Sequence, residues 1–244
     1  MNGKNYIWAI ILGASLLISV IAAGKAFNNR YNWKDTISVT GLGEVEFVSD
    51  LIVWEAYLTT KNTSLEQGYS TIESNGRKVK QYLKDQGIAD SLVQFMFVNT
   101  FQSSEPIYNG QNYVGQRNTG YGFRQQFKVE GTNVDLIERV SREISTLIAS
   151  GIMIESSSPS YFYTRLEDVK MSLIEKATTD AHDRAAIIAE KAGAKLGALA
   201  SAKAGIIQIT APNSTEDYSW GGTYNTTSRE KKASITMKLE YHIK

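Results

Sequence analysis

The sequence has 244 residues, of which 42% are hydrophobic and 21% charged, a balance typical of an ordinary globular protein. The formal net charge of +1 at pH 7, without a basic block in the body of the chain, argues against a nucleic-acid-binding face. The absence of cysteine excludes a disulfide framework, cysteine zinc sites, thiol catalysis and the acylated cysteine of a lipoprotein anchor.

An uncharged apolar segment covers residues 6–24, YIWAIILGASLLISVIAAG. As a helix it spans roughly 28 Å at about 1.5 Å per residue, close to the ~30 Å hydrocarbon core of a bilayer. We therefore predict a transmembrane anchor over residues 6–27, after a cytoplasmic N-terminus at 1–5 and before a linker at 28–35. The alternative is a cleavable signal peptide with Lys4 as its basic head, which predicts a secreted protein.

The body of the chain, residues 36–244, alternates between strand-like and helix-like patterns. Helices are expected from the cap at Ser64 to Gly87, from 133 to about 150, and from about 166 to the stop at Gly193. The expected strands are 37–48, 51–58, 92–101, 121–130, 151–164, 196–210 and 233–243, and the expected polar loops are 103–120 and 212–232. This order predicts an α+β fold with mixed or antiparallel sheets and about three helices, in addition to the N-terminal transmembrane helix. No proline- or glycine-rich linker divides the body, so we predict one continuous unit.

Two glycines one residue apart, Gly41 and Gly43, raise the question of a phosphate-binding loop. A dinucleotide fingerprint needs a third glycine where Glu46 stands, and it needs a helix where the strand pattern continues through Phe47. Glycine within a strand instead marks a bulge, a bend or a close approach of another backbone. The pair is therefore interpreted as structural.

The last predicted helix carries alanines at every fourth position: Ala177, Ala181, Ala185 and Ala189. Such a stripe lies on one face of a helix and lets another backbone approach closely. The contact can form within the fold or between subunits, and we favour the one within the fold.

Each polar loop combines aromatic rings with small polar residues. This mixture suits recognition surfaces, because rings give contact area at low entropic cost, and it also suits stacking on sugars. Self-association, glycan binding and loops with no dedicated partner all stay open. The candidate interaction residues in the loops 103–121 and 212–228 are Tyr108, Tyr113, Tyr218, Trp220 and Tyr224.

No catalytic, cofactor-binding or metal-binding residues emerge from the sequence. The two histidines, His182 and His242, are far apart, and the carboxylates around His182 are not spaced to converge on a helix. The metalloprotease, hydrolase and nucleotide motifs are absent. We therefore expect a protein that is not an enzyme and needs no cofactor.

The opening of the body resembles the SIMPL-domain family, whose members begin with V-x-G-x-G-x-V followed by a Pro-Asp turn. Val39, Gly41, Gly43 and Val45 fill the first pattern, and Asp50 fills the turn, although Ser49 stands where proline is usual. Residues 177–202 are similar to the family's late segment, in which D-A-x-x-R-A runs into A-G-x-x-L-G. The resemblance covers residues 36–244.

The resemblance implies a bacterial protein that is exported or membrane-anchored, since that is the habit of the family. Some members assemble into ring-like oligomers and some are linked to oxidative-stress tolerance. We therefore expect a single-pass inner-membrane protein with residues 36–244 in the periplasm, forming a homo-oligomer with a structural or envelope-stress role. The alternative is a module that binds envelope glycan, a small ligand or an envelope protein through the aromatic loops. The family supplies no catalytic residues to carry over.

Overall fold

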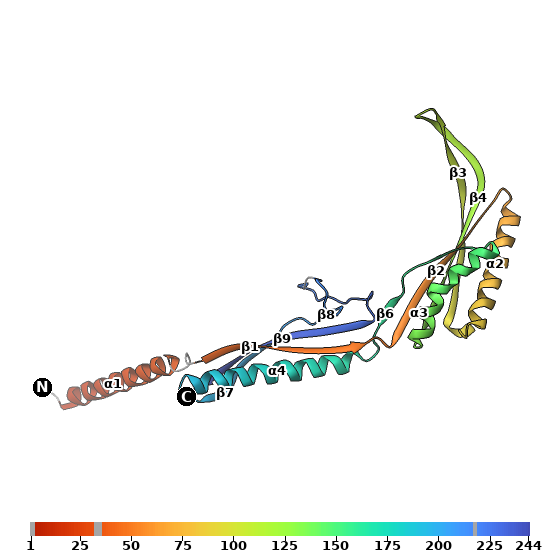
Figure 1. Cartoon of the computed structure of the whole chain (residues 1–244). Coiled ribbons are helices and arrows are strands. Elements are labelled where there is room, and N and C mark those ends of the chain that lie inside the picture. Colours follow the sequence, from red (N-terminus) through yellow and green to blue (C-terminus); the bar gives the residue numbers. More distant parts are fainter. Residues whose placement is uncertain (1–2, 32–35, 217–218) are drawn as a thin grey trace. The chain divides into compact units, whose positions relative to one another are not determined.

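The computed structural model describes the backbone of residues 3–31, 36–216 and 219–244, and the side chains of residues 11–27, 36–216 and 219–244 (Figure 1). Within these residues the fold is α+β, with four α-helices and two antiparallel sheets. The predicted fold class is thus confirmed, and of the two sheet types expected, the structure has the antiparallel one.

Most helices and strands follow one another through short connections, and the long connection lies between β8 and β9. In chain order they are α1 Gly3–Tyr31, β1 Thr36–Val48, β2 Leu51–Asn62, α2 Leu65–Asp85, β3 Val93–Asn109, β4 Asn112–Gly131, α3 Val134–Glu143, β5 Met153–Ser156, β6 Ser160–Phe162, α4 Leu166–Lys191, β7 Leu196–Ala204, β8 Gln208–Thr210 and β9 Glu230–Ile243. Short 3-10 helices cover Asp90–Leu92 and Ile144–Ser150.

The predicted transmembrane helix is not among the confirmed parts of the fold. In the described part of the chain, no helix combines the length and the apolar character needed to cross a membrane. The side chains of residues 6–10, at the start of the predicted anchor, lie outside the described residues.

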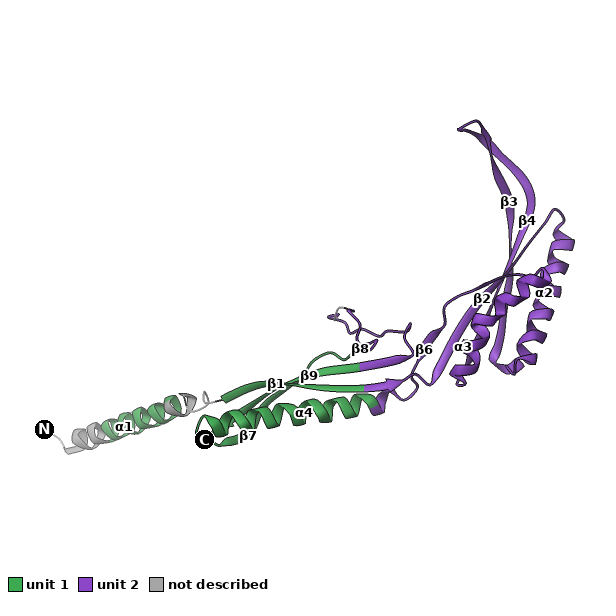
Figure 2. Ribbon diagram, viewed as in Figure 1, with its two compact units in different colours: residues 1–45, 169–208, 233–244 green, residues 46–168, 209–232 purple. Residues whose placement is uncertain are grey.

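The chain divides into two compact units (Figure 2). Unit 1 contains residues 1–45, 169–208 and 233–244, and unit 2 contains residues 46–168 and 209–232. Each unit is built from segments that are distant in sequence, which is why no linker marks a boundary between them.

Unit 2 contains the larger core. Its sheet has the order β3-β4-β2-β5, with β6 also paired to β2. Alternate residues of β2 point into the core, where Trp54 meets Phe127 of β4 edge-on at 5.5 Å between ring centroids. The amphipathic helices α2 and α3 cover this face with Ile72, Val79, Leu83, Ile137 and Val140, all fully buried.

The predicted ends of two helices are confirmed. Ser64 caps α2 by accepting a hydrogen bond from the backbone N–H of Gln67 at 3.4 Å. Gly87 follows that helix and Gly193 follows α4, with φ of 91° and 72°, a conformation that favours glycine.

In unit 1, α4 packs on strands of the sheet whose order is β1-β9-β7, with β8 also paired to β9. The buried face of α4 consists of Val169, Leu173 and the four stripe alanines. From Ile235 to Tyr241 the buried residues of β9 alternate with exposed or half-buried ones, as a half-buried strand requires.

The predicted loop at 103–120 is wrong, because these residues continue β3 and β4 as a hairpin. The turn lies at Gly110 and Gln111, and Gly110 has a φ of 63°, which two-residue hairpin turns demand. Backbone pairing between the two strands outweighs the loop-like composition of Gly, Asn and Ser.

Three further boundaries differ from the prediction. The helix expected over 133–150 changes to a 3-10 turn after Glu143. The strand expected over 151–164 splits into β5 and β6 around Pro159, which cannot donate to a sheet. The strand expected over 196–210 splits into β7 and β8.

Candidate interaction surfaces

The hairpin formed by residues 103–120, called the arm below, is a two-stranded ribbon within unit 2 (Figure 1). The pairing between β2 and β4 stops at Asn62 opposite Tyr121. Beyond that point β3 and β4 pair only with each other among the described residues, from Ser103 opposite Gly120 to Asn109 opposite Asn112. The base of the arm is covered, since Ser103 is buried, whereas residues 104–114 are all exposed.

The end of the arm is apolar and aromatic. Tyr108 and Tyr113 form a cross-strand pair, with ring centroids 6.1 Å apart in an edge-to-face arrangement. They are 60% and 57% exposed, and Ile107 and Val114 beside them are exposed as well. The structure thus brings together the two candidate aromatic residues of the first predicted loop.

Charge on the arm is balanced. Glu105 and Arg117 are its only charged residues, and they face each other across the strands at 3.3 Å. An exposed pair of this kind adds little stability. It leaves a neutral surface that has no preference for an acidic or a basic partner.

In the second candidate surface, the described residues 212–216 and 219–228 form no helix or strand, as predicted, apart from an isolated bridge between Tyr224 and Ile209. Trp220 is 96% exposed, and Tyr218 lies outside the described residues. Tyr224 is largely engaged within unit 2, where its hydroxyl accepts a hydrogen bond from the backbone N–H of Tyr163 at 3.3 Å and its ring stacks on Phe162. No described contact joins this segment to the arm.

Lys231 holds the end of this segment from within the protein. Its side chain is fully buried, and its ammonium group donates to the carbonyl oxygens of Asn225 at 2.5 Å and Ser228 at 2.7 Å. Burial lowers the pKa of Lys231 to about 8, and the nearby Glu216 carboxylate opposes this shift. The carboxylate of Glu216 also accepts a hydrogen bond from the Asn225 side chain and one from the backbone N–H of Ala211.

Sequence reasoning missed Lys231, although its position carried a signal. The buried face of β9 reads Lys231, Ala233, Ile235 and Met237 in steps of two. A lysine in phase with the apolar residues of a strand predicts a buried ammonium that needs acceptors.

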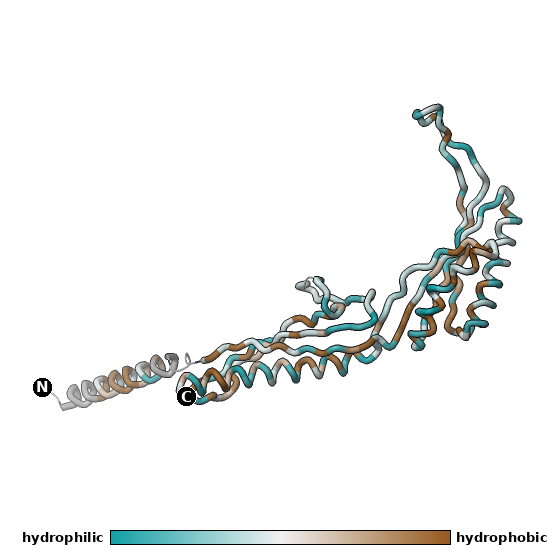
Figure 3. The backbone as a smooth tube through the Cα atoms, viewed as in Figure 1, coloured by the Kyte–Doolittle hydropathy of each residue, from teal (hydrophilic) through white to brown (hydrophobic). Residues whose placement is uncertain are grey.

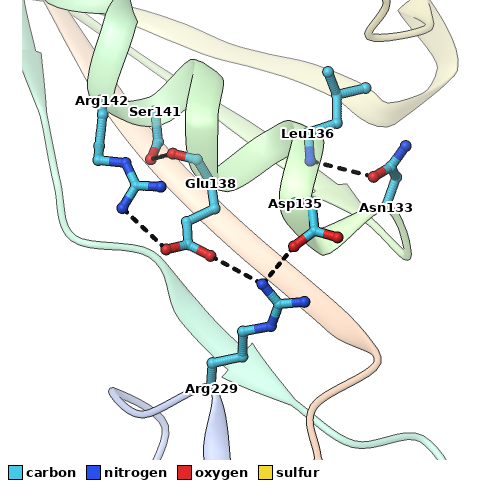
Figure 4. A network of polar contacts seen from close by, with 7 residues as sticks. All are labelled: Asn133, Asp135, Leu136, Glu138, Ser141, Arg142 and Arg229. Atoms are coloured by element: carbon cyan, nitrogen blue, oxygen red, sulfur yellow. Dashed lines mark hydrogen bonds and ion pairs between the residues drawn. The ribbon is translucent and has the colours of Figure 1, made fainter.

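A second polar network fixes the chain just before β9 (Figure 4). The Arg229 guanidinium contacts the carboxylates of Asp135 at 2.5 Å and Glu138 at 3.4 Å on α3. Glu138 also pairs with Arg142 at 3.1 Å. The pKa of Arg229 is raised, chiefly by its hydrogen bond to Asp135. This network attaches the end of the 212–228 segment to the helical side of unit 2.

The glycine pair and the alanine stripe belong to one contact in unit 1. A β-carbon placed on Gly41 would lie 2.2 Å from the carbonyl oxygen of Ala177 and 2.4 Å from the nitrogen of Ala181. One placed on Gly43 would lie 2.3 Å from the carbonyl oxygen of Leu173. The backbone of β1 therefore touches the backbone of α4, and Gly41 and Gly43 serve packing.

The Ser49–Asp50 turn joins β1 to β2. The Asp50 carboxylate accepts hydrogen bonds from the backbone N–H and the hydroxyl of Thr164, both at 2.8 Å. Ser49 donates its backbone N–H to the carbonyl of Arg229 at 2.9 Å, which the usual proline could not do. Its buried hydroxyl has no hydrogen-bond partner among the described residues.

Among the described residues, no three His, Cys, Asp or Glu side chains lie close enough to share a metal ion. His182 is exposed and contacts Asp183 and the ring of Tyr241.

A family model described as "SIMPL: Protein of unknown function (DUF541)" matches residues 37–240. No curated protein matches the chain. The match covers both compact units, including the arm and the glycine–alanine contact.

Proposed function

The chain belongs to the SIMPL family of proteins of unknown function, and from this premise we propose that it is a non-enzymatic, membrane-anchored periplasmic protein that self-assembles into a homo-oligomer. The observation that carries the proposal is the arm. An isolated two-stranded ribbon is marginally stable in water, and this one exposes Ile107, Tyr108, Tyr113 and Val114 at its end. A second copy that covers these residues buries apolar surface and stabilises the ribbon.

The neutral charge of the arm supports a partner of the same kind. Glu105 and Arg117 cancel, so steering by a strongly charged partner contributes little. Paired tyrosines are typical of the centres of protein–protein interfaces.

Membrane attachment through residues 6–27 is proposed on the sequence. Segment 6–24 carries no charge. The described part of α1 contains strongly hydrophobic residues (Figure 3). Eight of its large apolar side chains are 52–67% exposed. The family resemblance supports a single-pass inner-membrane orientation with residues 36–244 in the periplasm. Membrane fractionation and the mass of the mature chain distinguish this arrangement from secretion after signal-peptide cleavage.

The assembly test uses the full chain in mild detergent. The double variant Tyr108→Ser/Tyr113→Ser removes the exposed ring pair without touching the core. We expect wild type to have the mass of an oligomer and the variant to have that of a monomer, with the same circular dichroism. The matched control is Gln111→Ser in the turn, which should keep the oligomer. A monomeric wild type, or a variant that assembles as wild type does, refutes the proposal.

A structural or envelope-stress role for the assembly is part of the proposal. In the source bacterium, we expect deletion of the gene to increase sensitivity to oxidants, with rescue by wild type and by Gln111→Ser. Rescue that is equally good with the arm variant would separate the stress role from assembly.

The second candidate function is binding of envelope glycan or another small ligand, which the exposure of Trp220 favours. A free indole ring is suited to stacking on a sugar. The change Trp220→Ala should then abolish glycan pull-down while the oligomer mass stays the same. Pull-down that survives this change excludes the segment 212–228 as the binding surface.

A further inference from the structure

The sheet of unit 1 has two outer strands, β1 and β7, with β9 between them. Half of the outer edge of β1 is closed by side chains of α4. The backbone N–H of Leu42 donates to the Asp180 carboxylate at 2.8 Å, and the Lys176 ammonium donates to the Glu44 carbonyl at 3.1 Å. Arg184 holds the same Asp180 carboxylate at 2.9 Å. Capping of this kind prevents another strand from pairing there.

The other half of this edge is open. Backbone groups alternate along a strand, so Ser38 and Thr40 direct their N–H and C=O groups to the same edge as Leu42. In the described structure, no side chain of α4 is hydrogen-bonded to them. A hollow runs along this stretch, with Ile187 and Ile188 of α4 as its apolar wall, 58% and 49% exposed.

The outer edge of β7 can be assigned in the same way. Gly205 donates its N–H to the Thr236 carbonyl of β9 at 2.8 Å. Backbone N–H and C=O groups alternate between the two edges of a strand. Those of Ser201 and Lys203 therefore face β9, as those of Gly205 do, while those of Ala202 and Ala204 face the free edge. Their register partners in β9 are Leu239 and Met237, both buried. The two alanines therefore lie on the face of the sheet that α4 covers.

We propose that the free edge of β7 in one copy pairs with the open part of β1 in a second copy, beside Ile187 and Ile188. Strands β1 and β7 are both antiparallel to β9, so they run in the same direction and can pair as parallel neighbours. The small side chains of Ala202 and Ala204 then fall on the apolar wall, where a larger residue would be obstructed. This is strand addition to a sheet edge, with a second copy as the added chain.

The inference rests on the proposed self-assembly and adds a contact between copies, through the sheet of unit 1, to the contact proposed at the arm of unit 2. The two edges are different surfaces, so the contact is head-to-tail and generates a ring or an open helix. A two-fold dimer cannot form through it.

Cysteine cross-linking tests this pairing, because the chain contains no cysteine of its own. In a parallel register, Thr40 lies opposite Ser201 or Lys203 of the other copy, with both side chains on the face away from α4. The variants are therefore Thr40→Cys/Ser201→Cys and Thr40→Cys/Lys203→Cys. Within one copy β9 separates β1 from β7 by about 10 Å, beyond the ~7 Å limit between α-carbons for a disulfide. Any disulfide must then join two copies.

After mild oxidation of the full chain in detergent, we expect one double variant to form a ladder of dimers and higher species. Each single-cysteine variant should stay monomeric on a non-reducing gel, and a mixture of the two single variants should stop at dimers. A dimer of Thr40→Cys alone would mean that two β1 edges meet, which overturns the proposal.

A blocking variant completes the test. Proline at 202 removes an outward N–H that β9 does not use, so Ala202→Pro should keep the fold, shown by unchanged circular dichroism, and abolish the ladder. The control Ala202→Ser should keep both the fold and the ladder. A wild type with the mass of an oligomer but no ladder in either double variant refutes the edge pairing alone, whereas a monomeric wild type also refutes the proposed function.

Discussion

Replacing Gly41 by alanine tests the close contact between the backbones of β1 and α4. The added β-carbon would lie 2.2 Å from the Ala177 carbonyl oxygen, 2.4 Å from the Ala181 nitrogen and 2.7 Å from the Ala181 β-carbon. Two of these three atoms belong to the backbone of α4, so rotation of a side chain cannot relieve the overlap. Strand and helix must separate, which exposes part of the buried face.

The expected loss of stability in Gly41→Ala is the difference between two opposing contributions to the free energy of unfolding. Overpacking a tight contact costs about 1–3 kcal/mol, and immovable backbone neighbours place Gly41 near the upper end. Alanine also restricts the unfolded chain, which returns roughly 0.4–1 kcal/mol. The net loss is about 2 kcal/mol in the free energy of unfolding, a large share of the ~5–15 kcal/mol typical of a folded domain.

Urea unfolding of the full chain, followed by far-ultraviolet circular dichroism, measures this loss. The control Gly76→Ala lies in α2, where a β-carbon would meet Gln125 at 3.4 Å and Phe95 at 3.8 Å. It should leave stability unchanged or raise it by up to ~1 kcal/mol through helix propensity.

A double variant separates backbone from side-chain overlap at this contact. Adding Ala181→Gly to Gly41→Ala should not restore stability, because the closest atom is the Ala177 carbonyl oxygen. A loss below about 0.5 kcal/mol for Gly41→Ala, or rescue by Ala181→Gly, would refute the packing argument.

Three further changes probe unit 2 by urea unfolding. Between pH about 8 and 10.5 the unfolded chain keeps the Lys231 proton that the folded chain loses, so the free energy of unfolding of wild type should rise by up to about 1.4 kcal/mol per pH unit. The variant Lys231→Met should lack this contribution. Equal slopes of unfolding free energy against pH in the two proteins would contradict the lowered pKa of Lys231. Asp50→Ala should lower the free energy of unfolding by about 1–2 kcal/mol, because the two hydrogen bonds from Thr164 are lost. The control Thr164→Ser keeps both donors and should change stability little. Equal losses in the two variants would argue against these hydrogen bonds. Ser49→Ala should raise the free energy of unfolding by about 1 kcal/mol, because it removes an unpartnered hydroxyl. Ser49→Pro should lower it, because proline cannot donate the backbone hydrogen bond to the Arg229 carbonyl. A proline variant more stable than the alanine variant would refute the role given to this N–H.

Periodicity and caps were enough to predict much of the fold. Alternating residues identified β1 and β2, and Ser64, Gly87 and Gly193 marked helix ends that the structure confirms. These signals are local, because each depends on residues within one or two turns of the chain. Their reliability reflects backbone requirements that any tertiary context must satisfy.

The arm shows why composition alone is insufficient. A ribbon with water on both faces needs no alternation of apolar and polar residues, so the usual strand signal is missing from 103–120. Its Gly, Asn and Ser residues are also typical of loops. Only the cross-strand partners reveal that the segment is paired.

Long-range pairing limited the prediction of the candidate sites. Gly41 and the alanine stripe were each recognised, but more than a hundred residues separate them, so the sequence did not show that they meet. For Lys231, the alternation along β9 indicates a buried ammonium, but its acceptors are backbone carbonyls, which no side-chain pattern reveals.

The placement of β9 at the centre of the unit 1 sheet has a consequence for biosynthesis. It is the last of the described strands, yet it is the hydrogen-bonding neighbour of both β1 and β7. During translation, β1 and β7 therefore emerge without the strand that joins them, and α4 has no complete sheet to cover. Unit 1 can close only after residues 230–243 have left the ribosome. A nascent chain arrested before that point should be sensitive to protease throughout unit 1, even when the core of unit 2 is already protected.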